Sequence, residues 1–179
     1  LGTLLYDRRS ALRGALVLAT TLAFLSFARV AMSDMLLTLW TTLAVGLAVL
    51  AYRPGAPSWA VPVLGAVAGL GFATKGPVAL LVPGLAVLLL LWENRRRPLP
   101  CGGGPLALGV LAFAVLGLGW FALVYRSLGT EPLVYFFFRE NLERFAGDAY
   151  DVGRPFWFYP PAYLAEGLPW SALLPIALW

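Results

Sequence analysis

The sequence predicts an all-α protein, a polytopic bundle of transmembrane helices. Hydrophobic residues make up 60% of its 179 positions and charged residues only 12%, whereas soluble domains carry roughly 25% charged residues. The mean hydropathy is +0.80, and a globule of this size cannot bury so much apolar surface. The apolar residues also form runs near the length of about 20 residues that a membrane-spanning helix needs. We therefore expect a lipid bilayer to cover most of this surface.

Five complete spans and the start of a sixth are expected. Arg29 ends the first, and Ser33-Asp34 begin the second as an N-cap pair. Only Lys75-Gly76-Pro77 separates the third from the fourth, so these two form either a tight helical hairpin or one re-entrant pair. The expected spans cover residues 14–28, 35–52, 59–74, 76–92 and 105–125, and the sixth begins near Tyr163.

The charged residues predict the orientation of these spans. Alternating the spans places seven basic and two acidic residues on one side, and six basic and seven acidic residues on the other. The positive-inside rule makes the first side cytoplasmic. The net charge of +4 is then a topology signal, and we expect no nucleic-acid partner because no basic stripe lies on a soluble face. Asp34 and Lys75 fall on the outer side.

Composition also limits the chemistry. The chain has no histidine, which excludes histidine acid–base catalysis and histidine metal ligands within it. Cys101 is the single cysteine, so an internal disulfide and a cysteine zinc site are excluded. The chain begins at Leu1 and ends at Trp179 inside an apolar run, which predicts a piece of a longer membrane protein.

Three segments are expected. Residues 1–125 hold the spans and short loops, residues 126–162 form an extracytoplasmic loop, and residues 163–179 begin a further span. The loop is predicted to contain an amphipathic helix lying in the membrane interface. At α-helical spacing its apolar face would carry Phe138, Asn141, Leu142 and Phe145, and its charged face Arg139, Glu140, Glu143 and Arg144.

Two candidate site residues precede the second span. Asp34 has no basic residue immediately beside it, and charges at membrane depth usually face a wet cavity or a partner. It could serve as a metal ligand, a base or an acceptor for a substrate hydroxyl, or it could simply cap a helix. Arg29 either has a functional role beside Asp34 or extends its guanidinium group toward the membrane interface.

Lys75 is the sharper candidate. It lies between apolar residues and is followed by Gly76 and Pro77, which suit a close approach and the first turn of a helix. A lysine beside a helix N-terminus favours an anion. One interpretation is a lysine that binds a phosphate or diphosphate at the outer leaflet, and the other is a turn lysine that reaches lipid headgroups.

The outer loop contributes weaker candidates. Arg139, Glu140 and Arg144 are expected to line a cavity or to form ion pairs on a solvated helix face. Asn141 is either a hydrogen-bonded, buried residue or a site contact. Trp157 and Trp170 fit the role of interface anchors better than that of sugar-stacking platforms.

Five short motifs occur in order along the chain: residues 28–35 (ARVAMSDM), 73–77 (ATKGP), 137–145 (FFRENLERF), 154–159 (RPFWFY) and 167–170 (GLPW). Together they resemble the bacterial branch of the dolichyl-phosphate-mannose protein mannosyltransferase superfamily, most closely the group of lipid A aminoarabinose transferases. The resemblance covers nearly the whole chain. It implies a GT-C fold with many transmembrane helices and an outer cavity.

Family resemblance also implies an activity. Such enzymes transfer a sugar from a polyprenyl-phosphate donor to an extracytoplasmic acceptor such as lipid A or a protein, usually with inversion, in the bacterial inner membrane. Asp34 corresponds to an acidic cavity motif that in some members helps to hold a divalent metal, and Lys75 corresponds to the lysine that binds the carrier phosphate. Arg29 is expected to take part in binding the donor phosphate. A fixed cation would stabilise the charge on that leaving phosphate.

Two departures from the family pattern stand out. The catalytic carboxylate of the family lies in a first outer loop that this sequence does not contain, so this segment alone is expected to be inactive. The relatives also place a histidine where this chain has Asn141. A transporter for an anionic lipid or solute, with Lys75 at a discontinuous helix, and a non-catalytic membrane scaffold remain alternatives.

Overall fold

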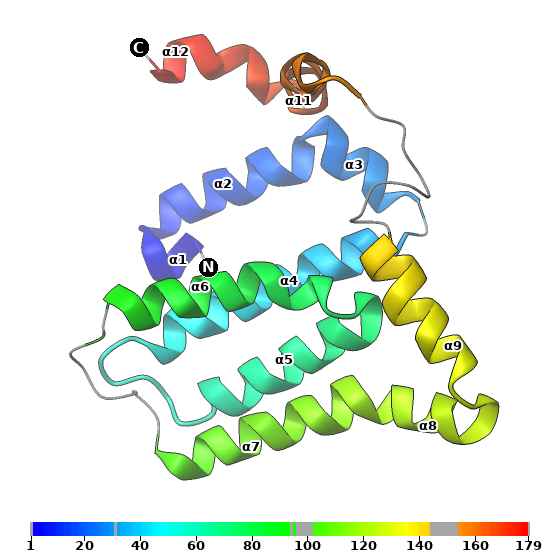
Figure 1. Cartoon of the computed structure of the whole chain (residues 1–179). Coiled ribbons are helices and arrows are strands. Elements are labelled where there is room, and N and C mark those ends of the chain that lie inside the picture. The colour runs from blue at the N-terminus through cyan, green and yellow to red at the C-terminus, as the bar shows by residue number, and fades with distance from the viewer. Residues whose placement is uncertain (1, 31, 94, 96–101, 144–153, 179) are drawn as a thin grey trace. The chain divides into compact units, whose positions relative to one another are not determined.

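The computed structural model describes residues 2–30, 32–93, 95, 102–143 and 154–178. These residues are predominantly helical and include no strand. They fall into two compact units, each of which is considered by itself. Unit 1 comprises Leu36–Ala149, and unit 2 comprises Gly2–Met35 together with Tyr150–Trp179. Figure 1 shows the helices along the chain.

Unit 1 contains two of the expected spans as long helices. Helix α4 (Ser33–Ala51), whose first three residues belong to unit 2, has 19 residues. Helix α7 (Gly103–Phe113), the π-helical turn η1 (Ala114–Leu118) and α8 (Gly119–Leu128) form one run of 26 residues. Both are long and apolar enough to cross a membrane. This confirms that residues 35–52 and 105–125 were correctly predicted as spanning helices by length and composition.

The third and fourth expected spans are shorter helices. Helices α5 (Ala60–Lys75) and α6 (Val78–Glu93) have 16 residues each and pack against each other as a hairpin. Counting the bent pair in unit 2 as one span, up to three spans meet the length and composition criteria within the described residues. The expected total of five to six is therefore not confirmed, because the remaining apolar helices are short or interrupted.

Glycines bring α5 into direct backbone contact with α7 and η1. A Cβ at Gly65 would clash with the carbonyl oxygen of Gly109, and a Cβ at Gly69 would lie 3.1 Å from the backbone nitrogen of Gly117. Gly65 and Gly69 are four residues apart on α5, so they share a face of that helix. Small residues at this spacing let membrane helices approach closely enough for dense van der Waals packing.

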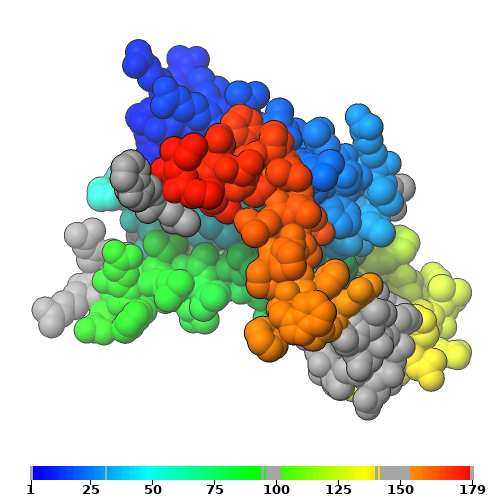
Figure 2. Space-filling view, turned by 90° about the horizontal axis from the view of Figure 1, so that it is seen from above, coloured from blue at the N-terminus to red at the C-terminus, as the bar shows by residue number. Residues whose placement is uncertain are grey.

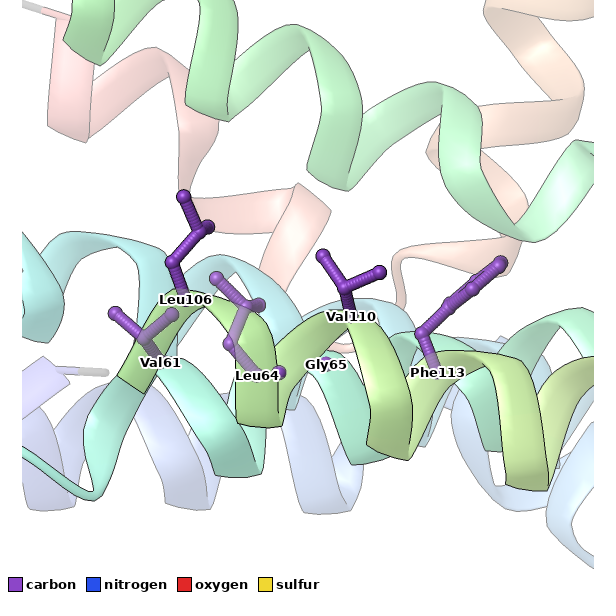
Figure 3. A pocket seen from close by; sticks show the side chains of 7 residues that line it. Val61, Leu64, Gly65, Leu106, Val110 and Phe113 are labelled. Carbon is purple, nitrogen blue, oxygen red and sulfur yellow. The ribbon is translucent and has the colours of Figure 1, made fainter. Parts of the chain in front are cut away.

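An open apolar groove of about 270 Å³ runs along the same helix pair. Figure 3 shows Val61 and Leu64 of α5 and Leu106, Val110 and Phe113 of α7 projecting toward the same side of the pair. Val110 is 63% exposed. The groove follows from the glycine contact, because the backbones touch and the flanking side chains are pushed outward.

Phenylalanine rings hold the part of unit 1 that was predicted to be an outer loop. Helix α9 (Glu131–Val134) continues into the π-helix η2 (Tyr135–Glu143), which has no counterpart in the α-helical prediction. Phe137 of η2 lies 5.1 Å from Phe121 of α8 and 6.1 Å from Phe72 of α5, measured between ring centroids. Phe72 also meets Phe113 edge-on at 5.6 Å. This cluster fixes η2 at the end of unit 1 where α5 terminates (Figure 1).

Unit 2 departs most from the prediction. The first expected span is broken into α2 (Arg8–Thr20) and α3 (Leu22–Ala28), which are bent by 62°. Thr21 between them is extended, and its hydroxyl donates back to the carbonyl oxygen of Val17. A threonine hydroxyl bonded to the preceding turn competes with the helical hydrogen bonds and bends the helix.

The C-terminal part of unit 2 is equally interrupted. The elements after residue 153 are η3 (Phe156–Phe158), α11 (Tyr159–Glu166), the 3-10 turn η4 (Trp170–Leu173) and α12 (Leu174–Leu178). At the other end of the chain, the short helix α1 (Gly2–Leu5) precedes α2. Residues 163–178 are thus not one uninterrupted helix, contrary to the expected sixth span, because Gly167 and Pro169 end α11. Figure 2 shows this orange-to-red segment lying across the blue helices α2 and α3.

Asp7 fixes the start of α2. Its Oδ1 accepts hydrogen bonds from the backbone N–H groups of Arg9 (2.7 Å) and Ser10 (2.9 Å), and the Ser10 hydroxyl donates to Oδ2. These bonds, first those from Ser10, lower the pKa of Asp7 below its ordinary value. Because the folded-state pKa is depressed, the cap stabilises α2 above the unfolded-state pKa, and this contribution is lost as the pH falls through the folded-state pKa.

We expect Asp7→Ala to accelerate amide hydrogen exchange at Arg9 and Ser10 at neutral pH, because both N–H groups lose their acceptor. Asp7→Asn should keep exchange at these two amides slow, since the side-chain amide oxygen still caps the helix. In this variant the protection should no longer fall at acidic pH, because residue 7 has no carboxylate to protonate. Exchange measured by mass spectrometry between neutral and acidic pH checks this. Equal protection in all three proteins would contradict it.

Candidate functional site

The hairpin between α5 and α6 carries Lys75 at its tip. Lys75 is the last residue of α5 and is half-buried, and Gly76 beyond it has φ +69° and ψ −149°, a backbone conformation that essentially only glycine adopts. The Gly76 N–H donates to the Phe72 carbonyl oxygen at 2.7 Å, and the Gly76 carbonyl accepts from Ala79 of α6 at 3.1 Å. The turn therefore holds the lysine backbone at one defined place between two helix ends.

The π-helix η2 packs directly on this turn. A Cβ at Gly76 would lie 2.9 Å from Cε1 of Phe136 and 3.4 Å from Nδ2 of Asn141. The Asn141 amide donates to the Phe136 carbonyl at 2.8 Å, five residues back. The structure thus brings together two elements that lie 65 residues apart in the sequence, the Lys75 turn and the segment containing Asn141.

The helix type changes which loop residues face inward. Phe136, Phe137 and Asn141 are half-buried, whereas Phe138 is 56% exposed. At α-helical spacing Phe138 and Asn141 would share one face, whereas in the π-helix, whose repeat is longer, Phe138 is exposed and Asn141 is half-buried. Asn141 is half-buried, donates a hydrogen bond to the Phe136 carbonyl and lies beside Gly76, and a role as a site contact stays a prediction.

The charged residues predicted for the loop lie in different parts of it. Arg139 is exposed, and its guanidinium lies over the Tyr135 ring at 5.9 Å from the centroid. Glu140 lies within η2. Arg144, like Phe145, lies outside the described residues. The roles of Arg139, Glu140 and Arg144 in a cavity stay predictions.

Arg29 and Asp34 belong to unit 2 and Lys75 to unit 1. Arg29 is the exposed C-cap of α3, and Asp34 is exposed in the first turn of α4. The rest of α4, which belongs to unit 1, packs closely on α5: the Cβ of Trp40 lies 3.3 Å from where a Cβ at Gly71 would be. The shared pocket of Asp34, Arg29 and Lys75 stays a prediction, since it joins the two units.

A metal at Asp34 was also expected. In the residues that the structure describes, Asp34 does not gather with two further aspartate, glutamate, cysteine or histidine side chains that could hold an ion. A single carboxylate is an incomplete ligand set. The residues present therefore do not fit a metal site by themselves.

Gly76 and Gly129 offer a matched pair for testing the turn. Gly129 follows α8 with φ +79° and ψ −159°, nearly the conformation of Gly76, but a Cβ there would meet nothing within 4 Å. We expect Gly129→Ala to lower the free energy of unfolding by about 1–3 kcal/mol, the cost of the strained backbone alone. Gly76→Ala should cost clearly more, because it must also displace Phe136. Unfolding in mild detergent measures both, and an equal loss would refute the packing of Phe136 on the turn.

The fold and the candidate site define a helical membrane protein. It has apolar helices of spanning length, a half-buried lysine at a hairpin tip and aromatic rings packed near that tip. The chain belongs to the dolichyl-phosphate-mannose-protein mannosyltransferase family, whose model matches residues 1–120. This confirms the resemblance seen in the sequence motifs.

Curated relatives point to one group within this family. The chain is 44% identical over 116 residues, 64% of its length, to the undecaprenyl phosphate-alpha-4-amino-4-deoxy-L-arabinose arabinosyl transferase of Pseudomonas aeruginosa strain UCBPP-PA14. It is 34% identical to the transferase of the same name, numbered 1, of Sodalis glossinidius, over 95% of its length. It is 35% identical to the transferase of that name of Pectobacterium carotovorum, over 96% of its length. It covers only 20%, 30% and 31% of these relatives. No solved structure matches the chain.

Proposed function

We propose that the full-length protein is an inverting membrane glycosyltransferase that takes a sugar from a polyprenyl-phosphate donor. The acceptor is an extracytoplasmic lipid such as lipid A, or a protein. The observation that carries the proposal is the half-buried Lys75, held at a glycine turn in a chain of this family. The names of the relatives make undecaprenyl-phosphate aminoarabinose the first donor to test.

Lys75 is proposed to bind the carrier phosphate. When the glycosidic bond breaks, negative charge accumulates on the leaving phosphate, and a preorganised cation stabilises that charge. Partial burial strengthens the interaction, because the surroundings screen it less than bulk water does. The fixed turn at Gly76 and the packing of Phe136 limit movement of the lysine backbone and so supply the preorganisation.

Arg29 and Asp34 are proposed as further functional residues. Arg29 would bind the donor phosphate as a second cation, and Asp34 would orient the acceptor by accepting a hydrogen bond from its hydroxyl. The base that deprotonates the acceptor is proposed to be a carboxylate outside this segment. No step is assigned to a metal, because Asp34 alone does not make a ligand set.

The proposed location is the bacterial inner membrane, with the site on its extracytoplasmic side. The lower positive charge of the side that carries Lys75 supports this orientation. Membrane lipids then surround the apolar helices, and a lipid-linked donor can reach Lys75 by diffusing within the outer leaflet.

The test uses the full-length protein in proteoliposomes with undecaprenyl-phosphate aminoarabinose as donor and lipid A as acceptor. Appearance of aminoarabinosyl lipid A with inverted anomeric configuration is expected. Donor specificity is checked with undecaprenyl-phosphate mannose, and acceptor specificity with a peptide. Absence of transfer to either acceptor from either donor would overturn the proposal.

The bend between α2 and α3 favours one second candidate. Transporters use discontinuous helices to place polar groups at membrane depth, and a 62° break is of this kind. The same proteoliposomes distinguish the two: movement of an anionic lipid across the bilayer without formation of a new glycosidic bond would favour transport.

A further inference from the structure

We propose that Trp170 and Thr20 are positioning residues: together they hold the bend between α2 and α3 and thereby set the place of Arg29. This inference rests on the proposed function for its catalytic meaning. Its structural part, that one contact from the C-terminal segment fixes the bend, stands on unit 2 alone.

The first observation is a hydrogen bond between residues 150 positions apart. The indole Nε1–H of Trp170 donates to the hydroxyl oxygen of Thr20 at 2.8 Å, and both side chains are half-buried. The Thr20 hydroxyl donates onward to the carbonyl oxygen of Leu16 at 2.7 Å. Indole has a single donor, and hydrogen bonds in such a chain polarise and strengthen one another.

A second bond joins the same two segments across the break. The backbone N–H of Leu22, the first residue of α3, donates to the Leu168 carbonyl at 2.8 Å. This N–H has no partner within its own helix, because it lies in the first turn. An unsatisfied backbone N–H is strongly destabilising in an apolar environment, so the partner from residue 168 stabilises the broken form.

The segment that reaches the break has a defined shape of its own. The Ser171 hydroxyl donates to the Leu164 carbonyl at 2.6 Å, and a Cβ at Gly167 would lie 3.1 Å from both Ser171 Cβ and the Tyr163 carbonyl oxygen. Residues 167–170 therefore form a compact turn that presents the Leu168 carbonyl and the Trp170 indole together. This gives the GLPW motif a structural role that the expected interface anchoring of Trp170 did not include.

The bend has a large effect at the end of α3. Seven helical residues are about 10 Å long, so a 62° bend displaces their far end by roughly 11 Å from a straight continuation. Arg29 is the C-cap at that far end. A displacement of even 1 Å of a substrate-positioning group can cost about 100-fold in rate. Residues that hold the bend therefore act on catalysis through Arg29 without touching the substrate.

The experiment uses the full-length protein with Thr20→Val, Trp170→Phe and the double variant. Each single change removes one partner of the Trp170–Thr20 hydrogen bond and keeps most of the volume of the replaced side chain. Trp157→Phe is the matched control, since Trp157 lies in the same unit and is 64% exposed. Spin labels attached in the Arg9→Cys, Phe27→Cys variant, with Cys101→Ser removing the native thiol of this segment, report the distance between exposed positions on α2 and α3.

We expect the three variants, but not Trp157→Phe, to lengthen or broaden the distance between the labels. We expect kcat for sugar transfer to fall about 10- to 100-fold with little change in the donor KM, and the double variant to match the single ones, because all three lose the same bond. An unchanged label distance, or a double variant whose loss is the product of the single losses, would overturn the inference. If the wild type transfers no sugar, the proposed function fails, while the label distances still decide the role of Trp170 and Thr20.

Discussion

Replacing Lys75 by alanine in the full-length protein is expected to lower kcat/KM for sugar transfer by about 100- to 1,000-fold, the usual cost of removing one preorganised group that stabilises transition-state charge. Lys75 is the only lysine in this sequence, is half-buried and occupies a fixed turn. Transfer from undecaprenyl-phosphate aminoarabinose measures the effect. Lys75→Arg should restore part of the activity, since it keeps the charge but not the shape of the ammonium group.

Arg126→Ala provides the control for this experiment. Arg126 is an exposed basic residue in the last turn of α8, on the predicted outer side, and it is not among the proposed phosphate-binding residues. Its removal changes the net charge equally and should leave transfer within about twofold of the wild type, because exposed charges are strongly screened. Wild-type turnover by Lys75→Ala would refute the phosphate-binding role. Asp34→Asn, tested in parallel, is expected to lower activity by weakening acceptor orientation.

Gly65→Val is the second large change and acts on folding. Even the Cβ of valine would clash with the Gly109 carbonyl oxygen, and backbone atoms cannot rotate away as a side chain can. We expect α5 and α7 to separate, with a loss of about 3 kcal/mol or more in the free energy of unfolding, at or beyond the upper end of ordinary overpacking. Denaturant unfolding of the purified protein, followed by circular dichroism, measures the loss.

Gly119→Ala is the matched control for Gly65→Val. Gly119 lies on the helical run of residues 103–128, which also contains the Gly109 that Gly65 contacts, but a Cβ at Gly119 would meet nothing within 4 Å. Because alanine favours helix over glycine by about 1 kcal/mol, this variant should be as stable as the wild type or more so. If Gly65→Val unfolds at the same denaturant concentration as Gly119→Ala, the close contact of α5 with α7 is disproved.

Local features of the sequence were sufficient for the long spanning helices. Apolar runs of the right length predict α4 and the helix over residues 103–128 because burial in lipid depends on the composition of one segment alone. The same applies to the ends of α5 and α6 around Gly76 and Pro77, whose backbone preferences are local. Lys75 could be selected as a candidate for this reason.

Local sequence features do not predict contacts between segments that are far apart in the chain. The run Phe136-Phe137-Phe138 indicates an aromatic contact. Its partners, Phe72 and Phe121, and the π-helical repeat that turns Phe136 and Phe137 toward them depend on packing. The break at Thr21 was likewise missed, since it needs a partner at residue 168 to satisfy the Leu22 amide. Two adjacent threonines were the only local sign of it.

The sequence by itself determined that this chain is a helical membrane protein of the mannosyltransferase family and that Lys75 lies at a tight turn. Only the tertiary structure decided that Gly76 receives Phe136 and Asn141, that Gly65 touches Gly109, and that Trp170 meets Thr20. The reason is physical: preference for lipid and backbone conformation depend on neighbouring residues, whereas close packing depends on which residues far apart in the chain meet in space.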